Sequence, residues 1–495
     1  MYCTKRKKLI KKRMLCLLFL PLNALATPIV NIDELNNQIH PMFTSSPNDR
    51  DQQFEKSNLY EFKENHPFDA KLITVPNASA PVFGTMNSIN IMDAVQQAVL
   101  THPDIQQQIS NYAAQNENIA VARSGYFPQF SGGINTGDMT SGERGRQLIS
   151  FSATQMLYDF GKVKSSVDIQ TARSWGAESQ LLVTVEDLSQ QVASTIVNIK
   201  RLQEMVRIAE QQIIGIQRIV EITQLRAQAG LSSQADPVQA QSYLESAQAN
   251  LIAQNSLLIQ YQLQLQNLIG FDIRQKNWVI PDSFVAHSDL YVDPEMNHIP
   301  KMLQAHAEIL VAQAQKSQAK LSRYPTLNVK GSMSQAVNGR NPNNNEDNGF
   351  YSSIMFEANS NFFQGGAIAA QTRSASYAEQ AARAKLNSVH LDILDQIRIS
   401  REQIAHKQEQ MKVLLARQRT TIKTKELYQE QYKLGTRSAL DLLNAEQSIH
   451  MATSDIENAR YDIYNSLVQY IAATGRGCEV YGLEQKNYLG NEIKP

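Results

Sequence analysis

The chain has 495 residues, of which 42% are hydrophobic and 19% are charged, and its 47 basic side chains balance its 47 acidic ones. A formal net charge of +0 excludes the basic footprint that nucleic-acid binding needs, so no nucleic-acid partner is expected. The length allows for two or three domains.

Residues 1–26 predict an export signal that is removed from the mature chain. A basic stretch, Lys5 to Arg13, precedes an apolar run that ends in the small-residue site Ala24-Leu25-Ala26. The alternative is a membrane anchor, but the run is shorter than the ~20 residues that a spanning helix needs. Cys16 lies early in the run with no small residues before it, which argues against a lipoprotein. Beyond the signal only Cys478 remains, so no intramolecular disulfide is expected.

Residues 27–88 form a polar, Pro-containing N-terminal extension for which irregular structure is expected.

An internal repeat then covers most of the sequence. "LYDFGK" (157–162) aligns with "FFQGGA" (362–367), and "AGLSSQADPVQAQ" (229–241) aligns with "LGTRSALDLLNAE" (434–446). Both pairs share an offset of about 205 residues, which indicates a duplicated domain. The predicted organisation is a first repeat at 89–270, a linker at 271–300 that belongs to a belt around the helices, a second repeat at 301–475 and a tail at 476–495.

Each repeat begins with a predicted helix, at Ile91 to Arg123 and at about Lys301 to Ser322. Two segments follow, at 129–157 and 327–361, in which apolar and polar residues alternate as in β-hairpins. The apolar positions are Phe130, Gly132, Ile134, Thr136, Ile149, Phe151, Ala153 and Leu157 in the first repeat and Leu327, Val329, Gly331, Met333, Ile354, Phe356 and Ala358 in the second.

Strands of roughly 10 residues with one apolar face fit a membrane-spanning β-barrel. A half-buried sheet in a soluble domain is the alternative, but few other strands exist to pack on it and the flanking helices are polar. Four strands do not close a barrel, which needs about eight. The missing strands would therefore come from other copies of the chain, so oligomerisation follows from the strand count.

Two helical segments, Lys162 to Ala229 and Ala367 to Leu434, would each extend ~100 Å at 1.5 Å per residue. Gly230 and Gly435 end them, and helix-like sequence resumes at 238–269 and 436–474. The two glycines are therefore predicted to mark the turns at the tips of two helical hairpins. A seven-residue leucine repeat in the first return segment predicts a coiled-coil seam at Leu244, Leu251, Leu258 and Leu265.

The duplication, "QMLYDFGK" (155–162) and "YKLGTRSALDLLNAEQ" (432–447) together resemble the TolC family of outer-membrane channel proteins, over about Ile89 to Gly475. The resemblance implies an α+β membrane protein. Four strands per chain would contribute to a trimeric 12-stranded outer-membrane β-barrel, continued by a long antiparallel α-helical (coiled-coil) periplasmic tunnel.

It further implies a homotrimer in the outer-membrane lipid of a Gram-negative bacterium, with a large periplasmic part. The expected partners are a periplasmic adaptor (membrane fusion) protein and an inner-membrane ABC or proton-driven transporter. No enzymatic activity, cofactor or metal is expected, and the nine histidines show no metal-ligand spacing.

Several functional residues follow from the resemblance and the repeat. Tyr158, Gly161, Phe363 and Gly366 are expected at the junctions between barrel and helices. Tyr432, Arg437 and Asp236 match the residues that hold the periplasmic end shut in the family, with Arg437 and Tyr432 donating to the Asp236 carboxylate. For Asp236, which precedes Pro237, an N-cap of the return helix is the alternative.

Asp441 matches a ring of acidic residues that lines the constriction in family members, and a solvated helix charge is the alternative. The second acidic position of that ring falls on Asn444, which puts strong cation binding in doubt.

The favoured function is a trimeric channel-tunnel that forms the outlet of a type I secretion system. The "LYDFGK" motif and the absence of a lipoprotein cysteine favour the secretion role. The alternative is the outer-membrane component of a small-molecule or multidrug efflux pump. A periplasmic coiled-coil scaffold without a pore is the alternative from another class.

Overall fold

The computed structural model describes residues 88–137, 146–270, 277–281, 284–285, 288–341, 343–360 and 363–483. All of them belong to the second of two compact units, Ala70–Pro495. The expected export signal and residues 27–87 of the extension lie outside the described residues.

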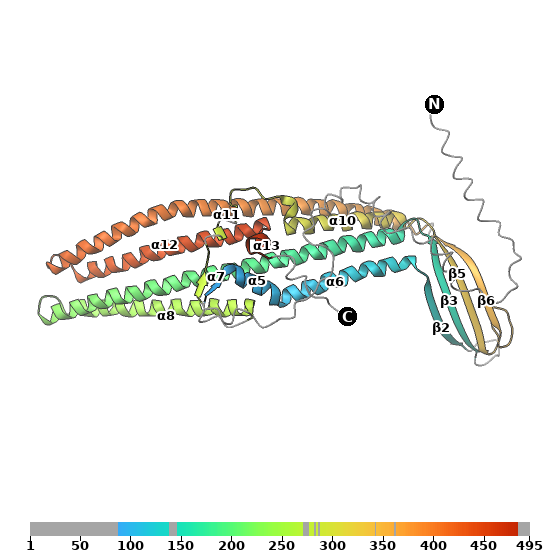
Figure 1. Ribbon diagram of the computed structural model, residues 1–495, viewed down its shortest axis with the longest axis horizontal. Helices are drawn as coiled ribbons and strands as arrows, with labels where there is room; N and C mark the ends of the chain where they lie inside the picture. The colour runs from blue at the N-terminus through green and yellow to red at the C-terminus, as the bar shows by residue number, and fades with distance from the viewer. Residues whose placement is uncertain are drawn as a thin grey trace, which may run out of the picture. The chain divides into compact units, whose positions relative to one another are not determined.

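Long helices make up most of the described part of the chain (Figure 1). They are α5 (Ile91–Thr101), α6 (Pro103–Arg123), α7 (Lys162–Gln228), α8 (Ala235–Ile269), α10 (Pro300–Leu321), α11 (Ala367–Lys433), α12 (Ala439–Thr474) and the short α13 (Gly477–Val480), with 3₁₀ turns at Ser124–Tyr126 and Met296–His298. Among these helices, none has both the length and the apolar run needed to cross a membrane.

The predicted helix from Ile91 to Arg123 is wrong in one respect, because it is interrupted at His102. Pro103 has no backbone N–H and restricts the residue before it to extended backbone. His102 has ψ of 132°, and its Nδ1 accepts a hydrogen bond from Asp104 N at 3.3 Å, so it caps the new helix α6.

The four predicted strands form one antiparallel sheet in the order β2-β3-β5-β6. Their bounds are Gln129–Gly137, Arg146–Tyr158, Thr326–Asn338 and Phe350–Asn359. The register pairs Gly132 with Phe151, and Val329 with Phe356. The predicted apolar positions therefore lie on one face of the sheet. A separate two-stranded parallel sheet joins β1 (Ser88–Asn90) to β4 (Asn277–Val279), so a strand begins at the last residue of the predicted extension.

The predicted fold class is confirmed: each half of the chain supplies two strands and one long antiparallel helical hairpin. The hairpins are α7 with α8 and α11 with α12, and α6 and α10 pack on α7. The sheet joins the ends of α6, α7, α10 and α11 that lie opposite the hairpin turns (Figure 1). Between the hairpins, α12 packs along α7.

The segment after α12 is fixed to α7 by a buried carboxyl group. Glu186 accepts hydrogen bonds from Gly477 N at 3.1 Å and from Cys478 N at 3.4 Å, at the start of α13. A Cβ on Gly477 would collide with this carboxyl group, so a glycine is needed there. Burial raises the pKa of Glu186 to about 8.

This pKa predicts a pH dependence of stability. Glu186 holds a proton in the folded chain up to about pH 8 but loses it near its ordinary value of 4.5 when unfolded. The stability that it contributes is therefore complete below pH 4.5 and is lost as the pH rises through 8. We expect Glu186→Gln, which keeps an acceptor oxygen without the charge, to reduce the fall in melting temperature between about pH 6 and pH 9.

Thermal unfolding followed by circular dichroism in detergent would measure this effect. Glu210→Gln, at an exposed position of the same helix, is the matched control and should follow the parent chain. An identical pH profile for Glu186→Gln and the parent would show that the buried group is not protonated.

Candidate functional site

The two hairpin turns share one backbone geometry. Gly230 and Gly435 have φ of 70° and 75°, a left-handed conformation that glycine adopts without steric cost. In the first turn Leu231 N donates to Arg226 O at 2.8 Å, and in the second Thr436 N donates to Gln431 O at 3.0 Å. Gly230 N and Gly435 N also donate to the residue three positions before them, at 3.1 and 3.0 Å. Together these bonds form Schellman motifs, which end both long helices at equivalent positions.

The hairpin tips are joined within one chain by an apolar cluster to which all four helices contribute. Its buried members are Ile216, Ile219 and Val220 of α7, Ala240, Leu244 and Ala247 of α8, Tyr432 of α11, and Ala439, Leu442 and Leu443 of α12. The two tips are thus packed against each other, and the candidate gate residues lie in or beside this cluster.

Tyr432 lies in this cluster and is only 4% exposed. The guanidinium group of Arg226 lies 5.0 Å from the centre of its ring, a cation–π contact between α11 and α7. The hydroxyl group of Tyr432 is buried and has no hydrogen-bond partner within the described residues. Burial raises the pKa of Tyr432. The charge of Arg226 opposes this shift, and the smaller effect of Asp236 adds to it. Asp236 therefore lies near enough to Tyr432 to act on its pKa, but within the described residues the two side chains form no hydrogen bond.

Asp236 lies within the first turn of α8, two residues after the N-cap residue Gln234. The alternative that Asp236 caps this helix is therefore wrong. Ser233 supplies a cap-like bond instead, since its Oγ accepts from Ala235 N at 3.2 Å. In the part of the chain that the structure describes, the Asp236 carboxylate makes no hydrogen bond or ion pair and remains available.

Arg437 is held by its own hairpin. Its Nε donates to Gln431 Oε1 at 3.0 Å, and its guanidinium group lies 4.4 Å from the ring centre of Tyr428. A weaker ion pair joins Nη1 to Asp441 Oδ2 at 3.7 Å. Among the described contacts of a single chain, Arg437 does not reach Asp236, contrary to a link between them inside one chain.

Asp441 completes a capping box at the start of α12. Ser438 Oγ accepts from Asp441 N at 3.2 Å, and Asp441 Oδ2 accepts from Ser438 Oγ at 2.9 Å and Ser438 N at 3.4 Å. The hydrogen bonds from Ser438, with the charge of Arg437, lower the pKa of Asp441. The carboxylate thus stays ionised and partly exposed at the tip.

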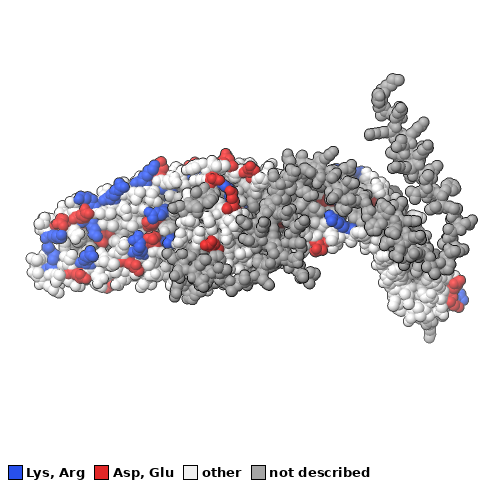
Figure 2. Space-filling view, in the orientation of Figure 1, with Lys and Arg blue, Asp and Glu red and all other residues white. Residues whose placement is uncertain are grey.

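Asn444 lies one turn further along α12 and is exposed. Its Oδ1 accepts a hydrogen bond from the Tyr243 hydroxyl group of α8 at 3.0 Å. The side-chain amide of Asn444 therefore connects the second hairpin to the first. Figure 2 shows that acidic and basic side chains alternate over the hairpin ends, whereas the visible face of the sheet is nearly uncharged.

At the junction between sheet and helices, Gly161 and Gly366 precede α7 and α11 with φ of 95° and 84°. The ring of Tyr158 meets that of Phe160 edge-on at 4.8 Å, while Phe363 is 85% exposed. Asp159, the residue that holds the start of α7 at this junction, was not identified from the sequence. Its buried carboxylate accepts from Gly161 N at 2.8 Å and Val163 N at 2.6 Å and so caps α7.

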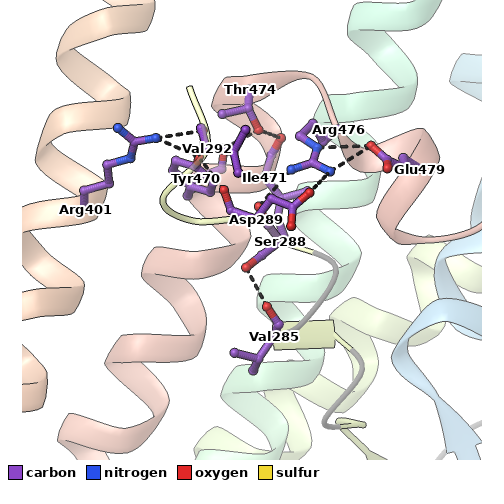
Figure 3. Close-up of polar contacts among 10 residues, drawn as sticks. All are labelled: Val285, Ser288, Asp289, Val292, Arg401, Tyr470, Ile471, Thr474, Arg476 and Glu479. Carbon is purple, nitrogen blue, oxygen red and sulfur yellow. Dashed lines mark hydrogen bonds and ion pairs between the residues drawn. The ribbon is translucent and has the colours of Figure 1, made fainter. Parts of the chain in front are cut away.

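Sequence reasoning also missed how the linker is fastened to the second hairpin (Figure 3). Arg401 of α11 donates to the backbone oxygens of Leu290 and Val292, both at 2.8 Å, and pairs with Asp293 at 3.0 Å. The buried hydroxyl group of Tyr470 donates to Val292 O at 3.2 Å.

A second arginine holds the preceding residue of the linker. Arg476 pairs with Asp289 at 2.6 Å and with Glu479 at 3.0 Å. Figure 3 shows the two arginines on either side of this linker segment. Apart from the pair of Arg476 with Glu479, these contacts join residues that are far apart in the sequence, so no local pattern predicts them.

A sheet with one apolar face, continuous with two long helical hairpins whose tips are charged, is the architecture of an outer-membrane channel subunit with a periplasmic helical part. The comparisons agree with this class. The family model "Outer membrane efflux protein" matches residues 94–271 and 295–476. The chain belongs to this family, which includes TolC.

The outer membrane protein TolC of Vibrio cholerae is 24% identical over 422 residues, which cover 81% of this chain and 95% of that protein. The alkaline protease secretion protein AprF of Pseudomonas aeruginosa is 22% identical over 412 residues, with 76% and 82% covered. The solved structure of CusC shares the fold, with a TM-score of 0.68 at 16% identity, over 81% of this chain and 99% of that one. The protein is located in the outer membrane of a Gram-negative bacterium, with its helices in the periplasm.

The capping box generates a prediction about the tip. Ser438→Ala removes the side-chain acceptor of the first turn of α12, which should cost about 1 kcal/mol locally. We expect faster amide exchange in residues 438–443, measured by hydrogen–deuterium exchange with mass spectrometry. Ser448→Ala, on an exposed face of the same helix, is the control. Unchanged exchange at the tip would show that the box does not hold the turn.

Proposed function

We propose that three copies of this chain form a channel-tunnel that carries substrates from periplasm-spanning machinery through the outer membrane. The favoured role is the outlet of a type I secretion system. The protein acts by conducting and gating, without catalysis.

The sheet carries this proposal. Within the described residues its outer strands, β2 and β6, are each paired on one side only. Its apolar face is open, with Phe130, Ile134, Ile354 and Phe356 between 67% and 81% exposed. Unpaired edges are not tolerated in hydrocarbon, so the strands of further copies must close the sheet. Three copies give twelve strands, enough for a lumen.

The opposite face supports a water-filled lumen. At one level all four strands present a serine: Ser131 pairs with Ser152, Ser152 with Ser332, and Ser332 with Ser353. The outer two pairs are hydrogen-bonded through their hydroxyl groups at 2.8 Å. A barrel of three sheets would carry a ring of small neutral hydroxyl groups at this level, which suits polar cargo of either charge.

At the other end, the hairpin tips are proposed as the gate. The unpartnered carboxylate of Asp236 and the partly exposed guanidinium group of Arg437 are complementary groups of one chain that do not meet. In a trimer, Arg437 of one copy would bind Asp236 of the next. Exposed links of this kind contribute about 0–1 kcal/mol each, weak enough for a partner to release.

Asp441 is proposed to face the axis, where three carboxylates would form a ring that attracts cations. Its lowered pKa keeps it charged at neutral pH. Asn444 would form a neutral ring one turn further in, so the selectivity should be weaker than with two acidic rings.

Two roles remain within this proposal. The likeness to AprF, a protein named for alkaline protease secretion, supports the secretion outlet. The description of the family model supports the alternative, a small-molecule efflux outlet. Membership of an outer-membrane family counts against the scaffold without a pore. A periplasmic adaptor and an inner-membrane ABC or proton-driven transporter are the proposed partners, and identifying which transporter copurifies after cross-linking in cells would separate the two roles.

The channel and its gate can be tested together in planar bilayers. We expect Arg437→Ala to raise the single-channel conductance, because the link between copies is lost, and Asp441→Ala to shift the reversal potential toward lower cation selectivity. Arg419→Ala, at an exposed position of α11, is the control.

The parent chain should run as a heat-labile trimer extracted from outer membranes. A soluble protein without conductance would refute the channel. Conductance unchanged in both Arg437→Ala and Asp236→Ala would refute the latch alone.

A further inference from the structure

A buried acidic residue connects the two hairpins above the apolar tip cluster. Glu446 of α12 is 2% exposed and lies against α7, a helix of the other hairpin. It follows Leu442 and Leu443 of the tip cluster by about one turn. At the same level of α7, Gly215 directly precedes Ile216, another member of that cluster.

Gly215 provides the space that Glu446 occupies. A Cβ built on Gly215 would lie well inside 3.0 Å of the carboxyl group of Glu446, a distance that real Cβ atoms essentially never show. Glycine in the middle of a helix is otherwise unfavourable by roughly 0.5–1 kcal/mol relative to alanine. The missing side chain is therefore a notch in α7 that seats one particular carboxylate.

Two side chains of the same hairpin bind the Glu446 carboxylate and keep it ionised. Lys425 of α11 forms an ion pair with Glu446 Oε2, and His450 Nε2 lies 3.1 Å from Oε1. Burial alone would raise the pKa of Glu446, but the bonds and charges of His450 and Lys425 outweigh it and lower the pKa. Glu446 is thus a fixed, charged contact among three helices.

The other notable glycine of α7 behaves differently. A Cβ on Gly176 would meet only Ala307 Cβ, at 3.6 Å, which is an ordinary contact. Higher up, α7 and α12 are also joined by Arg201 and Asp462 at 3.2 Å, but these side chains are 26% and 36% exposed and can adjust. Of these contacts between α7 and α12, the one at Gly215 holds a carboxylate that is 2% exposed.

We propose that Glu446, seated in the Gly215 notch, is a positioning residue that fixes the two hairpins of one chain against each other and so holds the tips in the closed arrangement. This inference rests on the proposed gate at the tips. A chain whose hairpins separate at this level would carry Asp236 and Arg437 out of register with those of its neighbours.

The test uses full-length trimers with Gly215→Ala. Leu231→Cys and Leu434→Cys, at exposed positions of the two turns, are introduced together with Cys478→Ser, and the two new cysteines carry nitroxide labels, with labelled chains as a minority in each trimer. Double electron–electron resonance then measures the separation of the tips within a chain, and planar bilayers measure the conductance. We expect a longer or broader distance distribution and a severalfold higher conductance.

Two variants separate positioning from general damage. Gly176→Ala should change neither measurement. Glu446→Asp in the Gly215→Ala background shortens the acidic side chain by one methylene while keeping its charge, and it should restore both the distance and the low conductance. Because Gly→Ala favours helix formation, loosening by Gly215→Ala would run against propensity. The yield of heat-labile trimer in each variant checks that it folds.

The outcomes are distinct. An unchanged distance distribution in well-folded Gly215→Ala trimers overturns the inference, as does a failure of Glu446→Asp to rescue it. A changed distance with unchanged conductance supports the positioning role but refutes the tips as the gate, so the two proposals fail separately.

Discussion

An unpaired strand edge in hydrocarbon leaves backbone N–H and C=O groups without hydrogen-bond partners, at a cost of several kcal/mol each. This constraint determines how the chain assembles, because the sheet of the described residues has four strands and an exposed apolar face that suits contact with lipid. Closure by further copies then sets the symmetry. In the proposed trimer, the helices that follow β3 and β6 would continue along the same axis and place equivalent hairpin tips around one point.

Duplication supplies this architecture, and the differences between the copies supply the specialisation. Phe160 and Gly365 occupy equivalent positions with φ of 61° and 57°, so the first copy tolerates a left-handed aromatic residue where the second has glycine. Stacking of Phe160 on Tyr324 at 5.1 Å offsets that strain. Asp236 and Asp441 are also equivalent. In the second copy the carboxylate is used by the capping box, whereas in the first it has no hydrogen bond or ion pair among the residues that the structure describes.

The sequence predicted those features that depend on local periodicity. Alternation along the strands gave the apolar face, and Gly230 and Gly435 indicated the turns, because both signals act over a few residues. The break at His102 could also have been predicted, since Pro103 restricts the residue before it to extended backbone. It was missed because helical periodicity continues on both sides. The leucine seam of α8 is seen in part within a single chain. Leu244 and Leu265 are buried, but Leu251 and Leu258 are only half-buried in a single chain.

Contacts between distant segments could not be predicted in this way. Arg401 with the linker and Glu446 with Gly215 depend on which helices meet, and a lone glycine or glutamate carries no such information. A glycine facing a buried carboxyl group recurs in this fold, at Gly215 with Glu446 and at Gly477 with Glu186.

The two buried carboxyl groups are stabilised by opposite means. Glu446 keeps its charge because Lys425 and His450 are beside it, whereas Glu186, whose main partners are two backbone N–H groups, is neutral up to about pH 8. A charged group in a tight notch resists displacement, since moving it away from Lys425 exposes an uncompensated buried charge. On the proposed positioning role, the charged contact thus lies beside the tips, whereas the neutral one holds the segment that follows α12.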